Sequence, residues 1–398
     1  MPTVRLKPGH VQPVWSGHPW VYAQAIEDVY PEAAAGDEVS VVDPRGNLLG
    51  RGFFSPASAI PVRLLVRNAQ TPLDAAFFRS RIEQAAALRT GLGLGLGRSE
   101  GFRLLHAEGD GLPGLIVDRY GDALAVQIGT IGMKQRESFV YDALEAVTFA
   151  SSILDRTSAQ TAKTEGFESI GGVVRGGDVR ELDFTERGLR FRIPRELGQK
   201  TGFYFDQRSL RARVEALSAG KRVLDAYSFV GAFAIAAARG GARDVVAVEE
   251  NALAVAVGIE CAEMNGVGSR VTFLKEDARR VLAASKGEFD LVVADPPRLA
   301  PTRAAREQAL VAYAKLAENG CRATRSGGLF VLSSCSAAVD LAALTRALAT
   351  GATRAGVEAV VLERWFQGAD HPVPAAFGEG LYLKALIARI ESRAQGSG

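Results

Sequence analysis

At 398 residues, with 47% hydrophobic and 23% charged side chains, the chain has the composition of a soluble globular protein of two or three domains. Its formal net charge of +2 does not indicate a polyanion partner, and its three widely spaced cysteines exclude a disulfide framework and a structural zinc site. Because the amino terminus lacks the apolar core of a signal peptide and no apolar run approaches membrane-spanning length, we expect a cytoplasmic protein.

The first segment, residues 1–72, contains short β-type stretches separated by turns. Residues 37–54 (DEVSVVDPRGNLLGRGFF) hold two such stretches around a Pro-Arg-Gly-Asn turn, which is a hairpin signature. Residues 59–67 (AIPVRLLVR) predict a further strand. We therefore expect a small β-barrel or sandwich.

The second segment, residues 73–190, mixes helical and β-type patterns. Apolar residues at helical spacing predict a helix that ends at Gly91. Strands are predicted around residues 103–128 and another helix over 134–147. The repeated glycines of residues 91–97 (GLGLGLG) follow a helix and do not match the dinucleotide fingerprint, so we interpret them as a flexible connection. The segment predicts a small α+β domain.

The third segment, residues 191–398, alternates regularly between strands and helices. Such alternation predicts an open, largely parallel sheet with helices on both faces, a Rossmann-like domain. The predicted strands cover residues 222–229, 244–250, 271–277, 289–297 and 328–336, and a helix is predicted over 302–323. Residues 357–390 look like two closing strands. Ligands of such sheets bind at the carboxyl ends of the strands.

Polar residues stand at the end of each predicted strand. In chain order they are Asp225, Glu249, Asp277, Asp295 and Cys335, and Gly231 permits close backbone approach where the helix after Asp225 begins. An acid at a strand end is often only a helix cap, but five such positions in this order form a stronger pattern. Without a glycine fingerprint, the pattern favours S-adenosylmethionine over a nicotinamide cofactor. Glu249 suits the ribose hydroxyls and Asp277 the adenine amino group.

Nearly the whole chain resembles the RlmI-type cytosine-5 methyltransferases of large-subunit ribosomal RNA. The resemblance is carried by GHPWVYAQAIEDV and GDEVSVVDPRGNLLGRGFFSP near the amino terminus, by LLHAEGDGLPGLIVDRYGD in the middle, and by GQKTGFYFDQR, LDAYSFVGAFAI, DLVVADPPRLAPTR, GGLFVLSSCS and GADHPVPAAFGEGLYLK in the last segment. It implies a PUA-like RNA-binding domain over 1–72, a central α+β domain over 73–190 and a class I methyltransferase domain over 191–398. It also implies ribosomal RNA as partner and a homodimer.

The resemblance assigns residues to the S-adenosylmethionine site. By matching motif, the cofactor-binding residues are Asp225, Ser228, Gly231, Glu249, Asp277 and Asp295, with Lys200, Phe203, Asp206 and Arg208 from an approach loop. Glu249 departs from the aspartate more frequent in the family, and the basic pair in EDARR has no interpretation.

Cys335 and Asp295 are the predicted catalytic residues. Carbon 5 of a cytosine is a poor nucleophile, and a thiolate that adds to C6 activates it through a covalent adduct. A carboxylic acid at N3 would assist this addition by proton donation if its pKa is raised. Cys335 could instead be a packed thiol, which is our interpretation of Cys261 and Cys321.

Two other functions remain open from the sequence. Guanine N7 methylation would use the same cofactor site, and a catalytically inactive ribosome-binding protein could retain the fold. Residues 187–222 contain ten basic and three acidic residues and are either an electrostatic footprint for RNA phosphates or a solvated helix face.

Overall fold

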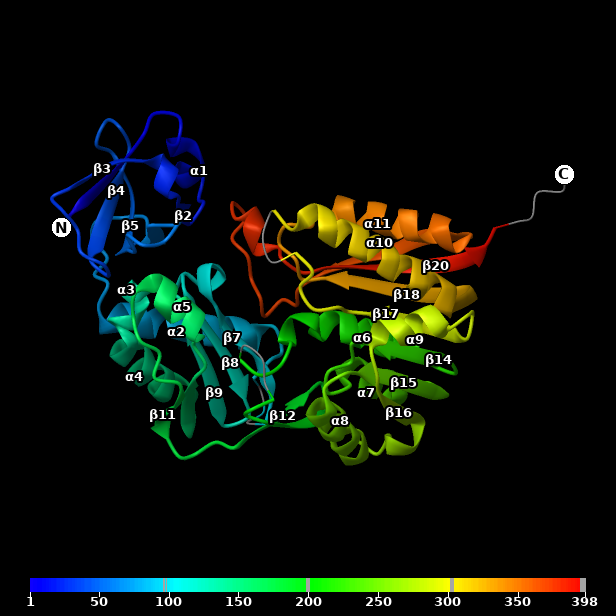
Figure 1. Cartoon of the computed structure of the whole chain (residues 1–398). Coiled ribbons are helices and arrows are strands. Elements are labelled where there is room, and N and C mark those ends of the chain that lie inside the picture. Colours follow the sequence, from blue (N-terminus) through cyan, green and yellow to red (C-terminus); the bar gives the residue numbers. More distant parts are fainter. Residues whose placement is uncertain (96, 98, 198–200, 301–303, 394–398) are drawn as a thin grey trace. The chain divides into compact units, whose positions relative to one another are not determined.

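The structure, a computed structural model, describes residues 1–95, 97, 99–197, 201–300 and 304–393 (Figure 1). The chain divides into two compact units, which are described separately. The first comprises residues 1–187, 193–205 and 369–380, and the second comprises 188–192, 206–368 and the residues from 381 onward. No helix in the described part of the chain is long and apolar enough to cross a membrane.

The first unit begins with a six-stranded sheet whose strand order is β2-β6-β5-β4-β1-β3. The predicted hairpin is confirmed, because β4 and β5 pair antiparallel around the Pro44-containing turn. Alternate residues of the strands point into a common core that includes Val4, Val39 and Leu64. The elements are β1 (Thr3–Leu6), α1 (Val11–Trp15), β2 (Trp20–Val21), β3 (Ile26–Tyr30), β4 (Glu38–Val42), β5 (Leu48–Phe54) and β6 (Val62–Val66).

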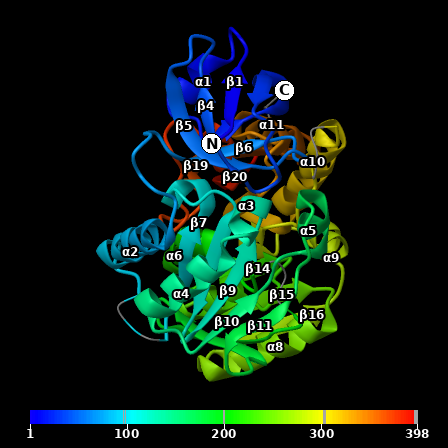
Figure 2. The same ribbon diagram turned by 90° about the vertical axis from the view of Figure 1, so that its left-hand side faces the viewer.

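The same unit continues with a five-stranded sheet of order β11-β10-β9-β8-β7, and Figure 2 shows helices α2 and α4 beside it. Asp74 caps α2 by accepting from the Phe77 N–H, and the helix ends at Gly91 as predicted. The elements are α2 (Ala75–Gly91), β7 (Gly101–His106), β8 (Leu115–Tyr120), β9 (Ala123–Ile128), α3 (Ile131–Lys134), α4 (Glu137–Thr148), β10 (Ser152–Asp155), α5 (Ala159–Glu165) and β11 (Gly172–Gly176). The described glycines of residues 91–97 connect α2 to β7, in agreement with the sequence interpretation.

Residues 369–380 belong to the first unit although they follow most of the second in sequence. The Arg89 guanidinium donates to the Asp370 carbonyl at 2.7 Å, and the Asp370 carboxylate accepts the Arg103 N–H at 3.1 Å. His371 Nδ1 lies 2.9 Å from the same carboxylate. These buried polar contacts explain why this segment packs with α2 and β7.

The second unit is built on a seven-stranded sheet of order β16-β15-β14-β17-β18-β20-β19. The first five strands in this order are parallel, and β20 and β19 add antiparallel, so the predicted Rossmann-like arrangement with two closing strands is confirmed. The strands are β14 (Arg222–Ala226), β15 (Asp244–Glu249), β16 (Val271–Lys275), β17 (Phe289–Ala294), β18 (Thr324–Ser334), β19 (Val357–Phe366) and β20 (Lys384–Ser392). The chain passes between the two units at β12 (Glu181–Glu186) and β13 (Leu189–Pro194).

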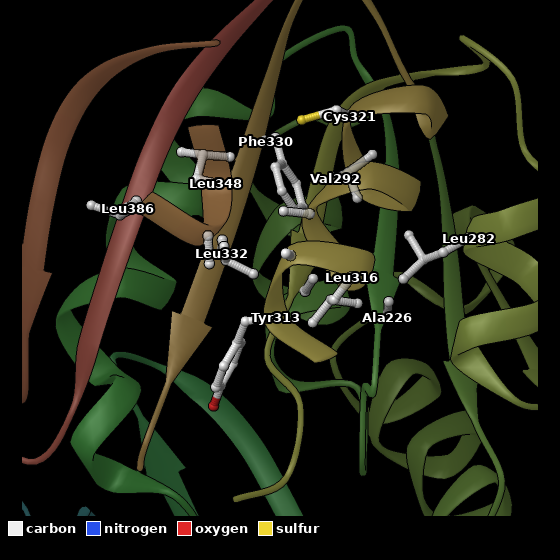
Figure 3. Close-up of a cluster of buried hydrophobic side chains, with 14 of the residues drawn as sticks. Ala226, Leu282, Val292, Tyr313, Leu316, Cys321, Phe330, Leu332, Leu348 and Leu386 are labelled. Carbon is white, nitrogen blue, oxygen red and sulfur yellow. The ribbon is translucent and has the colours of Figure 1, made fainter. Parts of the chain in front are cut away.

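Helices cover both faces of this sheet. They are α6 (Arg208–Leu217), α7 (Ala232–Arg239), α8 (Ala252–Met264), α9 (Ala278–Ala284), α10 (Arg306–Ala323) and α11 (Leu341–Ala355). Strand β17 is buried along its whole length, as expected for a central parallel strand. Figure 3 shows part of the core between this sheet and helix α10, where Phe330, Val292 and Leu316 pack together. Cys321 lies in this core and Cys261 is also buried, in agreement with the packing interpretation of both.

Candidate active site at the carboxyl ends of the sheet

Asp225 is the penultimate residue of strand β14 and is 1% exposed. Its Oδ2 accepts the Ala234 N–H at 3.0 Å, one of the amide groups in the first turn of α7 that have no partner within the helix. Burial raises the pKa of Asp225 to about 8, because its effect outweighs that of this hydrogen bond, which lowers the pKa. The negative charges of Asp295 and Glu249 raise the pKa further. Among the described residues, Oδ1 has no hydrogen-bond partner. The carboxylate therefore has acceptor capacity to spare for a ligand.

Substituting Asp225→Asn is expected to stabilise the protein without ligand while weakening cofactor binding. The raised pKa means that the folded state holds a proton that the unfolded state releases, so stability falls as pH rises from about 4 to about 8. Asn removes this loss, and we expect a melting temperature about 2–6 °C above wild type at pH 8. The difference should be clearly smaller at pH 5, closer to the pKa of the unfolded state.

Thermal unfolding at the two pH values measures this effect. Asp244→Asn, a carboxylate at the opposite end of the same sheet, is the control and should show no such pH-dependent gain. A melting temperature for Asp225→Asn equal to wild type at pH 8 would show that the buried carboxyl carries no unfavourable charge.

The turn between β14 and α7 is held in an unusual backbone conformation. Tyr227 and Phe229 have φ angles of 65° and 52°, in the left-handed region that non-glycine residues rarely adopt. Gly231 has φ 73°, and a Cβ at this position would lie 2.5 Å from the Phe273 ring. The hydroxyl oxygen of Ser228 is buried and has no hydrogen-bond partner in the described part of the chain. Such strain is typical of ligand-binding turns, and glycine is required where this one enters the helix.

Glu249 ends β15 and is half-buried. Its Oε2 accepts the Phe229 N–H at 3.0 Å, so it fixes the strained turn from the neighbouring strand, and Oε1 accepts the Asn251 N–H at 2.9 Å. Each carboxylate oxygen can accept a second hydrogen bond. This geometry leaves Glu249 able to accept further hydrogen bonds, and its contact with ribose hydroxyls stays a prediction.

Asp277 follows β16 and caps α9 by accepting the Arg279 N–H at 2.8 Å. The Arg279 guanidinium also donates to both of its oxygens, and this interaction lowers the pKa of Asp277. The first arginine of the pair in EDARR thus has an interpretation, as the ion-pair partner of this aspartate. Contact of Asp277 with an adenine amino group stays a prediction.

Asp295 directly follows β17, and the register of Ala294 against Leu332 places it beside the end of β18. Burial raises the pKa of Asp295 to about 6. A hydrogen bond from the Ser333 hydroxyl lowers this pKa, and the charge of Asp206 raises it. Gln207 Nε2 donates to Ser333 Oγ at 2.9 Å. Asp295 is therefore a carboxyl group that a polar network orients and that exchanges its proton near neutral pH.

Cys335 is the first residue after β18 and is half-exposed, unlike the two other cysteines. The turn that holds it is firmly anchored. The Ser336 N–H donates to Ser334 Oγ at 3.3 Å, and Ser336 Oγ accepts the Ala300 N–H at 3.1 Å and lies 3.4 Å from the Tyr313 hydroxyl. A thiol that is accessible at the carboxyl end of a central strand, on a rigid turn, can act as a nucleophile.

Comparison with known proteins identifies the family. The chain is 33% identical to the ribosomal RNA large subunit methyltransferase I of Shewanella denitrificans, over 97% of this chain and 99% of that relative. It is 32% identical to the protein of the same name from Klebsiella pneumoniae, with 98% of each chain covered. The chain belongs to the ribosomal RNA large subunit methyltransferase I family.

Domain and structural comparisons agree with this assignment. Residues 4–67 match the PUA-like domain family and residues 156–311 the S-adenosylmethionine-dependent methyltransferase family. The fold is that of a crystal structure of SMU.776, which is described as a methyltransferase complexed with SAH. The TM-score is 0.83 and the identity 18%, and the match covers 98% of this chain and 100% of that chain. A second structure is described as a SAM-dependent methyltransferase from Streptococcus mutans. It matches with a TM-score of 0.81 and 17% identity, over the same shares of the two chains.

S-adenosylmethionine is the cofactor of this methyltransferase domain, and the residues of the second unit fit it. Among the buried side-chain atoms that have no hydrogen-bond partner in the described residues are four oxygens of this site, and each can receive a polar ligand or water. They are Asp206 Oδ1, Gln207 Oε1, Asp225 Oδ1 and Ser228 Oγ. Asp225 interacts with Asp295, which in turn interacts with Asp206 and Gln207. Ser228 lies in the turn between β14 and α7, three residues after Asp225, so we assign the four to one site.

The predicted approach-loop residues have different outcomes. Asp206 joins the site, where its Oδ2 accepts the Tyr382 hydroxyl at 2.7 Å. Arg208 is the half-buried first residue of α6, and its cofactor contact stays a prediction. Phe203 is grouped with the first unit, where it packs on Phe184 with ring centroids 5.0 Å apart. Lys200 lies outside the described residues.

Three residues of the site were not predicted from the sequence. Gln207 orients Ser333, Tyr382 holds Asp206, and Lys384 places a buried ammonium group at the start of β20. Gln207 lies inside the motif GQKTGFYFDQR and the other two in GLYLK, so the motifs contained them. A lysine inside the apolar strand sequence LKALIARI is the signal that could have singled out Lys384.

The basic stretch of residues 187–222 is partly neutralised by ion pairs. Arg213 pairs with Glu363 at 2.6 Å and Arg222 with Asp244 at 3.0 Å. Arginines held in such pairs contribute less field to a phosphate backbone than the sequence count indicates. A role for this stretch in RNA binding stays a prediction.

Proposed function

We propose that this protein forms 5-methylcytosine in large-subunit ribosomal RNA, 23S RNA in bacteria, with Cys335 as nucleophile and Asp295 as proton donor. The observation that carries the proposal is the half-exposed Cys335 directly after β18, beside a carboxyl group with a pKa of about 6 at the end of the adjacent strand β17. The names of the curated relatives support ribosomal RNA as the substrate.

The proposed reaction balances with these two groups and one further base. S-adenosylmethionine would supply the methyl group and would leave as S-adenosylhomocysteine. The Cys335 thiolate adds to C6 of the cytosine while the Asp295 carboxyl protonates N3, which gives C5 the electron density to accept a methyl cation equivalent. A base then removes the C5 proton, the thiolate leaves C6, and the N3 proton returns to Asp295.

Covalent trapping tests this function. 23S RNA transcribed with 5-fluorocytidine has no C5 proton to lose, so with cofactor the wild type should form a denaturant-resistant protein–RNA complex. Bisulfite sequencing of ribosomal RNA from a deletion strain should show one cytosine that has lost its protection. Methyl transfer to a guanine without trapping would instead support guanine N7 methylation, and cofactor binding without any transfer would support an RNA-binding protein.

The domain, compartment and assembly predictions follow from the same proposal. We propose that residues 1–72 bind RNA as a PUA-like domain, that residues 73–190 form the central domain and that residues 191–398 form the methyltransferase domain. We also propose that the protein acts in the cytoplasm and that it forms a homodimer. Light scattering of the purified protein measures the last of these directly.

A further inference from the structure

Lys384 is a buried lysine next to the proposed nucleophile. It is 3% exposed, at the first position of β20, where it pairs with Ser334 of β18. Its ammonium group donates to the Ser336 carbonyl at 2.9 Å and to the Tyr382 carbonyl at 2.8 Å. Cys335 lies between Ser334 and Ser336. Lys384 pairs with Ser334 on the adjacent strand, and its ammonium group is hydrogen-bonded to Ser336.

Burying a lysine is unfavourable, and the cytosine mechanism described above assigns this one no role. Burial lowers the pKa of Lys384 to about 8, while the charges of Cys335 and Asp340 raise it and that of Arg298 lowers it. Arg298 and Asp340 are exposed to solvent, which screens their charges. The effect of Cys335 on Lys384 is reciprocal: an ammonium group that is favoured by the thiolate also favours the thiolate.

Two other described titratable groups near this turn, Tyr313 and Asp295, do not supply a positive charge. Tyr313 reaches the turn from α10, and burial raises its pKa, so it is a neutral phenol. Asp295 approaches from the end of β17 and carries a negative charge when ionised. Lys384 is therefore a buried cation held at the turn that carries the thiol.

We propose that Lys384 is a positioning residue that anchors the turn from Ser334 to Ser336 and, as an ammonium ion, favours the thiolate form of Cys335. This inference rests on the proposed function, since it assigns Lys384 to the activation of that nucleophile. Deprotonation of Cys335 releases its proton to solvent, and Lys384 keeps its own proton at neutral pH. A thiolate is the nucleophilic form of cysteine, so the ion pair raises the reactive fraction.

The test is the pH dependence of Cys335 alkylation by iodoacetamide in the RNA-free protein, followed by mass spectrometry of the Cys335 peptide. In Lys384→Met the midpoint should move at least about one unit upward, so that alkylation at pH 7 slows about tenfold. Lys384→Arg keeps the charge and should restore most of the rate. Lys315→Met, an exposed lysine of α10, is the matched control and should leave the profile unchanged.

A purely structural lysine gives a different result. If Lys384 only anchored the turn, Lys384→Met would expose Cys335 and alter alkylation by a similar factor at every pH, with the same midpoint, and this outcome would overturn the proposal. Melting temperature and cofactor binding show whether the variant is folded. Because alkylation needs no RNA, a shifted midpoint in a protein that traps no 5-fluorocytidine RNA would support the ion pair while refuting the cytosine function.

Discussion

Cys335→Ala should abolish methylation, with kcat reduced at least about 10⁴-fold, while the protein still binds S-adenosylmethionine. The expected loss is large because C5 of cytosine has too little electron density to attack a methyl group until a nucleophile adds to C6. Alanine also forms no complex with 5-fluorocytidine RNA. Cofactor affinity should stay within about threefold of wild type, a change below 1 kcal/mol, because Cys335 follows β18 and the unpartnered polar atoms of the cofactor site lie on other residues.

The control for this substitution is Cys261→Ala. Cys261 is fully buried in α8, and its thiol donates to the Arg192 carbonyl at 3.8 Å. This variant should keep its activity within about twofold of wild type. Methylated cytosine produced by Cys335→Ala at a comparable rate would contradict the covalent mechanism, provided that the melting temperature confirms a folded protein.

The strands and their polar ends could be predicted because they are local features of the sequence. The apolar run of β17 followed by Asp-Pro-Pro, and that of β18 followed by Ser-Ser-Cys-Ser, indicate where each strand ends. Parallel strands end at one edge of the sheet, so the proximity of Asp225 and Asp295 followed from the fold class. The helix predicted over 302–323 begins at Arg306 in the described residues, and β18 begins at Thr324, before the predicted residue 328.

The contacts that tune the site could not be predicted because they join residues far apart in the chain. Tyr382 and Asp206 are separated by 176 positions, and Gln207 and Ser333 by 126. Neither hydrophobic periodicity nor turn chemistry specifies such pairs. The pKa of Asp225 likewise depends on how completely α7 and the adjacent strands bury it, and burial is a property of the folded unit. The sequence therefore predicts which strand-end residues meet at the sheet edge, but neither the distant residues that contact them nor their protonation.

Asp295→Asn should lower kcat by about 10²–10⁴-fold, the range expected for loss of a general acid. Asparagine can still donate a hydrogen bond to the ring, but it has no proton to transfer to N3. In the wild type the acid form is populated below pH 6 and lost as pH rises through about 6, so this group should contribute a falling limb to kcat/KM above that pH. The limb should be absent from Asp295→Asn, which leaves only the rising limb of thiol ionisation.

Rates of adduct formation with 5-fluorocytidine RNA separate this role from cofactor binding. Asp295→Asn should form the adduct more slowly by a factor similar to its loss in kcat, because protonation of N3 accompanies addition of the thiolate to C6. Asp244→Asn, at the amino-terminal end of β15, should match wild type in both measurements. An Asp295→Asn enzyme that forms the adduct at the wild-type rate but produces no free methylated RNA would place the carboxyl at the release of the product after methyl transfer, and its raised pKa would then follow from burial alone.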